Sequence, residues 1–338
     1  MSRAARRAAG PAAGGPADAA TDRGGALRVG ISSCLLGRPV RWNAGHKRDA
    51  YITDTLGQWF EWVPVCPEEE LGLGVPRETL RLEGDPEAPR LVFRNTRTDF
   101  TGRMADWSQA RVAGLAGLDL CGYILKSDSP SCGMERVKVI GPSMGAGKKG
   151  VGIFARALME RLPLLPVEED GRLHDPRLRE NFIERVFAYR RLRDLLAERL
   201  TVGRLVEFHT RHKLLILSHS TEHYRALGGL VAGGTSLPPR ALAERYAEMF
   251  MAALKIKATP RKHANVLQHL LGYMKDDLMP DDKEEILAAI DDCRREQAPL
   301  VVPLALLRHH LRRLKVEYIL DQTYLSPHPR ELMLRNHV

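Results

Sequence analysis

As far as residue 162, this 338-residue chain alternates short strand-like runs with runs whose apolar positions recur near the helical period. This alternation restricts the fold class, because strands that alternate with helices along the chain build a mostly parallel sheet. Beyond residue 180 the periodic segments read mainly as helical. We therefore expect an α/β N-terminal domain with a mostly parallel sheet, followed by an all-α C-terminal domain.

The pattern also predicts individual elements. Strands are expected at residues 27–32, 62–65, 91–95 and 121–127, with helices at 46–60 and 101–118. Further helices are expected within 181–200, 201–231, 239–257, 259–278, 280–297 and 302–320. Pro260 and Pro280 stand where a first helical turn favours proline.

These elements suggest a division of the chain into four parts. Residues 1–27 are rich in Ala, Gly, Pro and Arg and are expected to be a disordered leader. Residues 28–162 form the α/β domain and 201–330 the helical domain. Between them, 163–200 are expected to be a linker and connecting helix, because 163–180 carry prolines, a glycine and alternating charges.

Composition narrows the class of protein. The chain has five cysteines, an odd count, and its first residues lack the continuous apolar run of a secretory signal, so reduced thiols in a cytoplasmic protein are expected. No apolar run approaches the ~20 residues that cross a bilayer. The net charge of +9 fits a polyanionic partner such as nucleic acid, and also an ordinary basic surface.

Three of the cysteines follow strand-like runs, namely Cys34, Cys66 and Cys132. Ligands of open α/β sheets bind outside the carboxyl ends of the strands, so these thiolates can converge on one site. A structural zinc ion normally has four ligands, often in CxxC pairs, and the chain has no CxxC. An open site of three thiolates favours an iron-sulfur cluster. Cys121 and Cys293 are interpreted as small apolar residues.

The same loops carry groups that could act on a substrate. Glu68, Glu69 and Glu70 follow Cys66, and Ser127, Ser129 and Ser131 precede Cys132. A carboxylate beside a cluster could act as a general base, and a hydroxyl could hold a substrate oxygen. The alternative interpretation is structural: an acidic first helical turn and a serine-rich turn.

Three motifs together resemble the thiouracil desulfidase (TudS-like) family. They are SSCLLG with RWNAGHKR, VCPEEELGLGVPRE, and LKSDSPSCG, in the family's order within residues 28–160. The resemblance implies a 4Fe-4S cluster held by Cys34, Cys66 and Cys132, whose fourth iron takes the sulfur of a thiolated pyrimidine. It places the catalytic acid on Glu68 and the catalytic serine on Ser129 or Ser131.

The helical half resembles the YbgA-like family through EFHTRHKLLILSHS, PRKHANVLQHLLGYMK and PLVVPLALLRHHL, over about residues 200–330. The fusion is similar to tRNA 4-thiouridine desulfidases, which implies a non-redox enzyme that converts 4-thiouridine in tRNA to uridine and releases sulfide. Thiolated tRNA is then the expected partner, with no obligate protein partner inferred. The alternatives are a desulfidase of free thiouracil or a thiouridine nucleotide, and a non-enzymatic iron-sulfur RNA-binding module.

Basic residues of the helical half are the candidates for RNA binding. They are Arg261 and Lys262 in one segment, and Arg308, Arg312 and Arg313 in another. Tyr224, Tyr246 and Tyr273 could stack an extruded base. The alternative interpretation is a solvated helix face, where Lys and Arg are usual.

One shorter motif points elsewhere. His219, Glu222 and His223 form HSTEH, which matches the pattern of inverted zinc proteases. That pattern needs its structural context and a further ligand, and no further ligand is identifiable. It therefore does not predict a protease.

Overall fold

The computed structural model describes residues 27–141, 146–234 and 237–338. Its α/β part contains a four-stranded parallel sheet, sheet A, in the order β2-β1-β5-β8. The strands are β1 (Leu27–Ser32), β2 (Phe60–Val65), β5 (Gly122–Leu125) and β8 (Val167–Glu169). Most of the expected leader, residues 1–26, lies outside the described residues.

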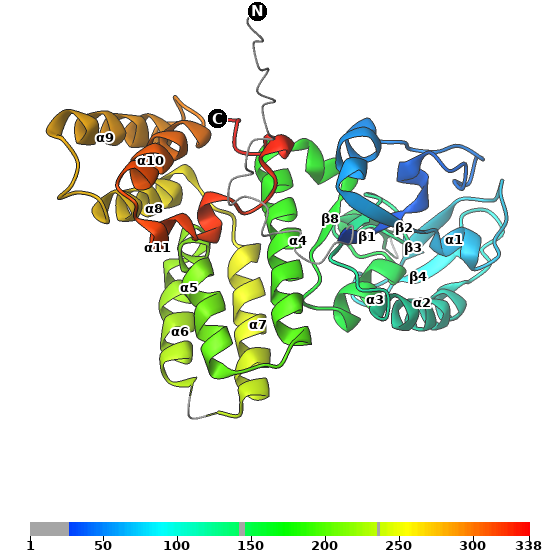
Figure 1. The fold of residues 1–338 in the computed structure, drawn as a ribbon. Helices are drawn as coiled ribbons and strands as arrows, with labels where there is room; N and C mark the ends of the chain where they lie inside the picture. The colour runs from blue at the N-terminus through cyan, green and yellow to red at the C-terminus, as the bar shows by residue number, and fades with distance from the viewer. Residues whose placement is uncertain (1–26, 142–145, 235–236) are drawn as a thin grey trace, which may run out of the picture.

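Both faces of sheet A are covered, as in other parallel sheets. On one face α2 (Thr101–Ala116) and α3 (Ile153–Arg161) pack against each other and supply Val112, Leu115, Phe154 and Leu158 to the core. On the other face a π-helical turn (Tyr51–Thr55) and α4 (Pro176–Ala197) enclose Val29 and Ile31. Figure 1 shows α4 between the sheet and the other long helices.

A second, mixed sheet was not expected from the sequence. Sheet B has the order β4-β3-β6-β7, with β3 parallel to β6 and the other pairs antiparallel. Its strands are β3 (Leu80–Glu83), β4 (Arg90–Phe93), β6 (Val137–Ile140) and β7 (Ala146–Gly150). The predicted strand at 91–95 belongs to this sheet, and the fold class of an α/β domain followed by helices is confirmed.

Two local expectations differ from the structure. Residues 46–60 contain a short π turn and a 3-10 turn, Tyr51–Thr55 and Leu56–Gln58, in place of one helix. The Asp49 carboxylate accepts the Ile52 amide of the first of them at 3.0 Å. The segment 163–180, expected to be a linker, contains β8. Tyr123 pairs with Val167, and all three residues of β8 are buried, so a strand too short to show a period completes the sheet.

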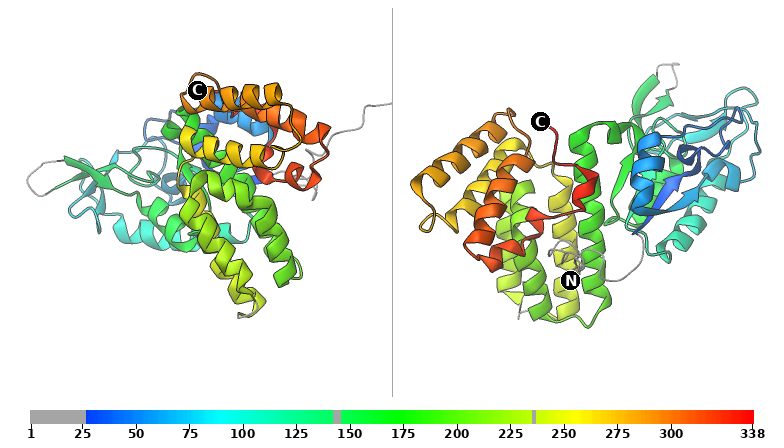
Figure 2. Two further views of the ribbon diagram at one scale, coloured as in Figure 1. Left: turned by 90° about the vertical axis from the view of Figure 1, so that its left-hand side faces the viewer. Right: turned by 45° about the horizontal axis from the view of Figure 1, so that its top comes forward.

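The remaining long helices form two layers. α5 (Val202–His219), α6 (Thr221–Ala232) and α7 (Pro239–Lys255) pack beside α4. At their upper end lie α8 (Pro260–Gly272), α9 (Pro280–Arg294) and α10 (Val301–Arg313), as Figures 1 and 2 show. No helix in the described part of the chain is long and apolar enough to span a membrane.

Helix starts follow the local sequence. The Thr259 hydroxyl accepts the Lys262 amide ahead of α8, and the Asp175 carboxylate accepts the amides of Arg177 and Leu178 ahead of α4. Such caps satisfy amides that have no partner inside the helix. Pro260 and Pro280 begin α8 and α9, as predicted.

The end of the chain returns to the α/β part after the short helix α11 (Glu317–Leu320). We call residues 321–338 the C-terminal strap. Its Leu332 and Leu334 belong to the apolar cluster that contains Val29 and Ile31 of β1, whereas its Tyr324 belongs to the core of the helices. The strap therefore connects the two halves of the molecule.

Candidate functional site

Two of the predicted ligand thiols follow neighbouring strands at one edge of sheet A. Ser32 and Val65 are register partners at the ends of β1 and β2. Cys34 lies two residues after β1 in a 3-10 turn, and Cys66 directly follows β2 and precedes α1 (Pro67–Glu70). The strand order changes direction between β1 and β5, which is the point where open α/β sheets bind ligands.

The third thiol, Cys132, lies in the turn after β5, which is fastened to the start of α3. The Ser129 hydroxyl oxygen accepts the amides of Ser131 at 3.3 Å and Cys132 at 3.1 Å. The Ser131 carbonyl accepts the Phe154 amide of α3 at 3.0 Å. At Gly152 a Cβ atom would lie 2.5 Å from that carbonyl oxygen, so only glycine fits there.

The thiols lie in one neighbourhood, where Cys34 affects the pKa of Cys66 and both affect that of Cys132. Burial raises the pKa of Cys34 and of Cys66 to about 11, and Cys34 adds to the effect on Cys66. Burial also raises the pKa of Cys132 well above its usual value. The charges of neighbours, Cys66 and Cys34 among them, raise it further. Thiols of this kind stay protonated unless a cation replaces the proton.

The donor set fits an iron-sulfur cluster better than one metal ion. Among the described residues, no group of three or more His, Cys, Asp or Glu side chains is arranged to hold a single ion. A cluster asks for a wider arrangement, because each cysteine ligates a different iron and the thiolates need not meet at one point. Cys34 and Cys66 follow neighbouring parallel strands, and Cys132 lies in the turn after the next strand, β5, so three thiols from three strand ends fit that arrangement.

A carboxylate lies among these thiols. Glu68, in the first turn of α1, affects the pKa of Cys34, Cys66 and Cys132. Its Oε1 accepts the Ser131 hydroxyl at 3.0 Å, and its Oε2 accepts Arg77 Nε at 2.9 Å. Ser131 is fully buried.

Arg77 is held as firmly as the carboxylate that it binds. Its side chain is 3% exposed, and its guanidinium also donates to the carbonyls of Val40 and Gly74 at 3.0 and 2.9 Å. A guanidinium fixed on several sides gives Glu68 one orientation. Sequence reasoning missed Arg77, although it stands inside the VPRE part of a motif.

The structure separates the three consecutive glutamates. Glu70 accepts the Cys66 amide at 3.1 Å and pairs with Arg111 at 2.9 Å, so it caps α1. Glu69 is exposed. Glu68 alone of the three bonds a serine of the turn after β5.

A second charged pair at this edge was also missed. Asp170 follows β8 directly and accepts Lys126 Nζ at 2.9 Å and the Ser127 amide at 2.7 Å. Lys126 lowers the pKa of Cys34, although the effect of burial is larger. The sequence signal for Asp170 is a carboxylate at the end of a strand. It was missed because that strand, β8, has three residues and lies in a segment expected to be a linker.

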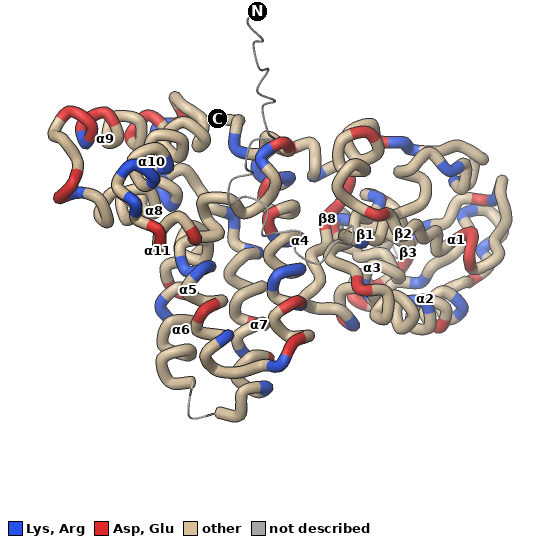
Figure 3. The backbone as a smooth tube through the Cα atoms, in the orientation of Figure 1, with Lys and Arg blue, Asp and Glu red and all other residues tan. Residues whose placement is uncertain are grey.

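The basic candidates of the helical half lie on two helices. Arg261 is exposed at the start of α8, whereas the ammonium of Lys262 donates to the carbonyls of His219 and Lys257 at 2.7 and 3.0 Å. Arg308, Arg312 and Arg313 lie on α10, which carries much of the blue colour of that layer in Figure 3.

Two other sequence features have structural roles. Tyr246 is fully buried and bonds His209, so it cannot stack an extruded base. His219 of the HSTEH motif bonds Glu184 and the Ile256 carbonyl, each at 2.6 Å, which uses both of its ring nitrogens. This histidine is therefore a core residue.

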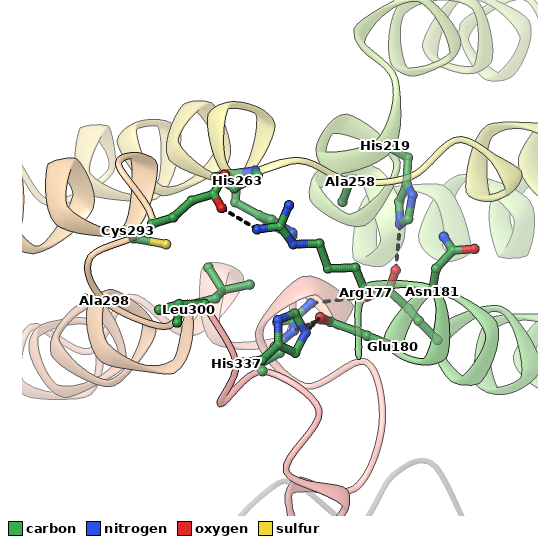
Figure 4. A pocket seen from close by; sticks show the side chains of 15 residues that line it. Arg177, Glu180, Asn181, His219, Ala258, His263, Cys293, Ala298, Leu300 and His337 are labelled. Atoms are coloured by element: carbon green, nitrogen blue, oxygen red, sulfur yellow. Dashed lines mark hydrogen bonds and ion pairs between the residues drawn. The ribbon is translucent and has the colours of Figure 1, made fainter. Parts of the chain in front are cut away.

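A cavity of about 60 Å³ lies between α4, α8 and the C-terminal strap (Figure 4). Glu180 in its wall bonds His337 at 3.0 Å and Arg335 at 3.1 Å, and Arg177 pairs with Glu296 at 2.6 Å. Because these charges are paired with one another, the cavity walls hold the strap in place.

Comparison with known proteins assigns both halves. Residues 29–170 match the family described as 2-thiouracil desulfurase, and residues 213–329 match DUF1722, described as a protein of unknown function. The N-terminal half is thus a desulfidase-type α/β domain. Both resemblances found in the sequence are confirmed.

The chain belongs to the family of the uncharacterized protein YbgA from Escherichia coli (strain K12). The two are 32% identical over 163 residues, which cover 47% of this chain and 95% of YbgA. A solved structure titled [4Fe-4S]-dependent thiouracil desulfidase TudS is 27% identical, with a TM-score of 0.36, over 44% of this chain and 94% of that one.

Proposed function

We propose that this protein is an iron-sulfur dependent, non-redox desulfidase that converts 4-thiouridine in tRNA to uridine and releases sulfide. The observation that carries the proposal is the Glu68–Ser131 pair beside three thiols, two of them buried, at the ligand-binding edge of a parallel sheet. The match of residues 29–170 to the 2-thiouracil desulfurase family supports the reaction class.

In this proposal Cys34, Cys66 and Cys132 hold a 4Fe-4S cluster. When bound by three thiolates, such a cluster offers one iron without a protein ligand, which can act as a Lewis acid toward a thiocarbonyl sulfur. Burial of Cys34 and Cys132 limits the access of water to those two thiols. Lys126 and Arg41 favour the ionised form of Cys34, against burial, and so favour ligation.

Glu68 is the proposed general base. The overall reaction adds water across a thiocarbonyl carbon: the water oxygen becomes the carbonyl oxygen, sulfur leaves as sulfide, and no electron is transferred. Glu68 would take the proton of the attacking water while Arg77 keeps its carboxylate oriented.

Either serine of the turn could orient the substrate. Ser131 donates its hydroxyl proton to Glu68, which supports a role in positioning that carboxylate. Ser129 accepts two backbone amides through its oxygen and keeps its own O–H for another acceptor. Both remain candidates for the catalytic serine.

The helical half is proposed to bind the tRNA. The net charge of +9 and the arginines on α10 support it, together with Arg261 on α8. Lys262 is a weaker candidate than the exposed Arg261, because its ammonium already bonds two carbonyls.

The proposal is tested by anaerobic purification, measurement of iron and sulfide, and assays on thiolated tRNA and on free 2-thiouracil. We expect a bound cluster and release of sulfide from thiolated tRNA. Activity on the free base without activity on tRNA would instead identify a desulfidase of small thiobases. A cluster without any sulfide release would leave a non-enzymatic module.

A further inference from the structure

A large groove lies between α10 and the C-terminal strap. Its volume is about 860 Å³, and its walls come from residues 301–313 on one side and 325–336 on the other. A hollow of this size can take several groups of an extended ligand.

The groove is rich in arginine. Its lining includes Arg308, Arg312 and Arg313 from α10 together with Arg330 and Arg335 from the strap. Among the described lining residues the one carboxylate is Glu331. Cations that converge in a hollow of low dielectric raise the local concentration of anions.

Three of these guanidiniums lack a carboxylate partner in the described part of the chain. Arg312 and Arg330 are exposed, and Arg308 is half-buried with one hydrogen bond, to the Ser326 hydroxyl at 2.9 Å. Burial lowers the pKa of Arg308 to about 10, and the further causes are the guanidiniums of Arg335, Arg330 and Arg312. The fold thus holds like charges together.

The other two arginines are less available. Arg335 donates to Glu180, Glu184 and the Tyr324 carbonyl. Arg313 is 3.8 Å from Asp282. Within the described part of the chain, the groove guanidiniums without a carboxylate partner are therefore those of Arg308, Arg312 and Arg330.

We propose that this groove binds phosphate groups of RNA through Arg308, Arg312 and Arg330. The inference rests on the proposed function, since it says where the RNA backbone of that substrate binds. It also adds a residue of the strap, Arg330, that sequence reasoning did not include. The planar guanidinium matches phosphate with two parallel hydrogen bonds. A backbone segment can enter a concave groove, whereas a flat bilayer surface cannot.

The strap also fixes the groove relative to the desulfidase domain. Leu332 and Leu334 pack in the apolar cluster of β1, and Arg335 bonds α4 through Glu180 and Glu184. An RNA bound between α10 and the strap would thus have a fixed position relative to both halves of the protein. This gives the two-domain chain a physical means to present one nucleotide of a long substrate.

The test measures the affinity of the full chain for unmodified tRNA over a series of salt concentrations. Arg312→Gln and Arg330→Gln remove exposed side chains without a carboxylate partner, so the fold should persist. Each should weaken binding several-fold and reduce the slope of log affinity against log salt by roughly 0.7 to 0.9, as expected for one lost phosphate contact. Arg225→Gln, an exposed arginine on α6, is the matched control and should bind as the unchanged protein does.

A double variant Arg312→Gln, Arg330→Gln with unchanged affinity and slope would overturn the proposal. So would groove-dependent binding of phosphatidylglycerol vesicles, or of mononucleotides from digested tRNA, that matches or exceeds the binding of tRNA. Failure of the groove is distinguishable from failure of the function. Sulfide release from thiolated tRNA with no effect of the groove variants would refute the groove alone, and groove-dependent binding without sulfide release would refute the enzyme alone.

Discussion

Single side chains at the sheet edge divide into those that would hold a cluster and those that would act on substrate. Cys34 and Cys132 are buried and Cys66 is partly buried. Burial raises the pKa of each thiol, and the charge of Cys34 adds to the effect on Cys66 and on Cys132. Cys121 and Cys293 lie elsewhere, at the opposite end of β5 and on α9. Position thus separates the five cysteines where residue type cannot.

Replacing any one of the three edge cysteines should remove the cluster. In Cys34→Ala, Cys66→Ala or Cys132→Ala the broad visible absorption of an iron-sulfur protein should be lost or strongly reduced, because a ligand is missing. Cys121→Ala and Cys293→Ala are the controls and should keep the spectrum and the iron content. A fully loaded Cys66→Ala protein would show that the ligands have been assigned wrongly.

Glu68→Gln should separate catalysis from assembly. The amide keeps the size of the side chain and can still bond Ser131, but it cannot take a proton, so turnover should fall by about 100-fold or more while iron content persists. The matched control is Glu69→Gln, which changes an exposed neighbour. If Glu69→Gln abolishes sulfide release and Glu68→Gln does not, the assignment of the base is wrong.

Among the elements, the turn after β5 is held by contacts with a later part of the chain. The carbonyls of Pro130 and Ser131 accept amides from the first turn of α3, so a helix start supports the loop that carries Cys132. Helix N-termini have amides without partners inside the helix, which makes them suitable anchors for a loop. The absence of a side chain at Gly152 permits this close approach.

Gly152→Ala should therefore disturb the cysteine loop. The new Cβ would lie 2.5 Å from the Ser131 carbonyl oxygen, so the backbone must shift, and we expect a loss of about 1–3 kcal/mol in unfolding free energy with reduced cluster content. Chemical denaturation and iron analysis measure both effects. Gly114→Ala on α2 meets no atom within 4 Å and should be neutral or stabilising. Equal behaviour of the two variants would contradict this account.

For the molecule as a whole, the boundary between the halves is not a flexible joint. α4 covers sheet A with Phe182, Ile183 and Val186 and packs against α7 with its other side. A chain ending at residue 165 would lack β8, Asp170 and α4, and so would not retain the α/β core. The two halves share a core through α4 and the strap.

Arg335→Met should destabilise both halves together. It would leave Glu180 and Glu184 buried without their arginine, at a cost of roughly 3–5 kcal/mol in unfolding free energy, in one cooperative transition. Thermal and urea unfolding of the full chain measure the change, with Arg225→Gln as the exposed control. A variant as stable as the unchanged chain would show that the strap is not a structural fastening.

Local pattern determined much of this protein. The spacing of apolar residues predicts the parallel strands β1, β2 and β5, and prolines at the first helical turn predict the starts of α8 and α9. These features depend on residues close in sequence. Motifs that each occupy a short stretch led to both families. Cysteines at strand ends could be predicted to share one edge, because parallel strands present their carboxyl ends together.

The tertiary structure alone decided which groups meet. Glu68 is distinguished from Glu69 and Glu70 by its bonds to Ser131, 63 residues away, and to Arg77. Asp170 reaches the site through a strand too short to have a period. Likewise the groove joins Arg308 to Arg330 from separate segments, and Arg335 pairs with Glu180 across 155 residues. Such pairings follow from how apolar faces pack, and a pattern read along the chain carries no record of which distant segments pack together.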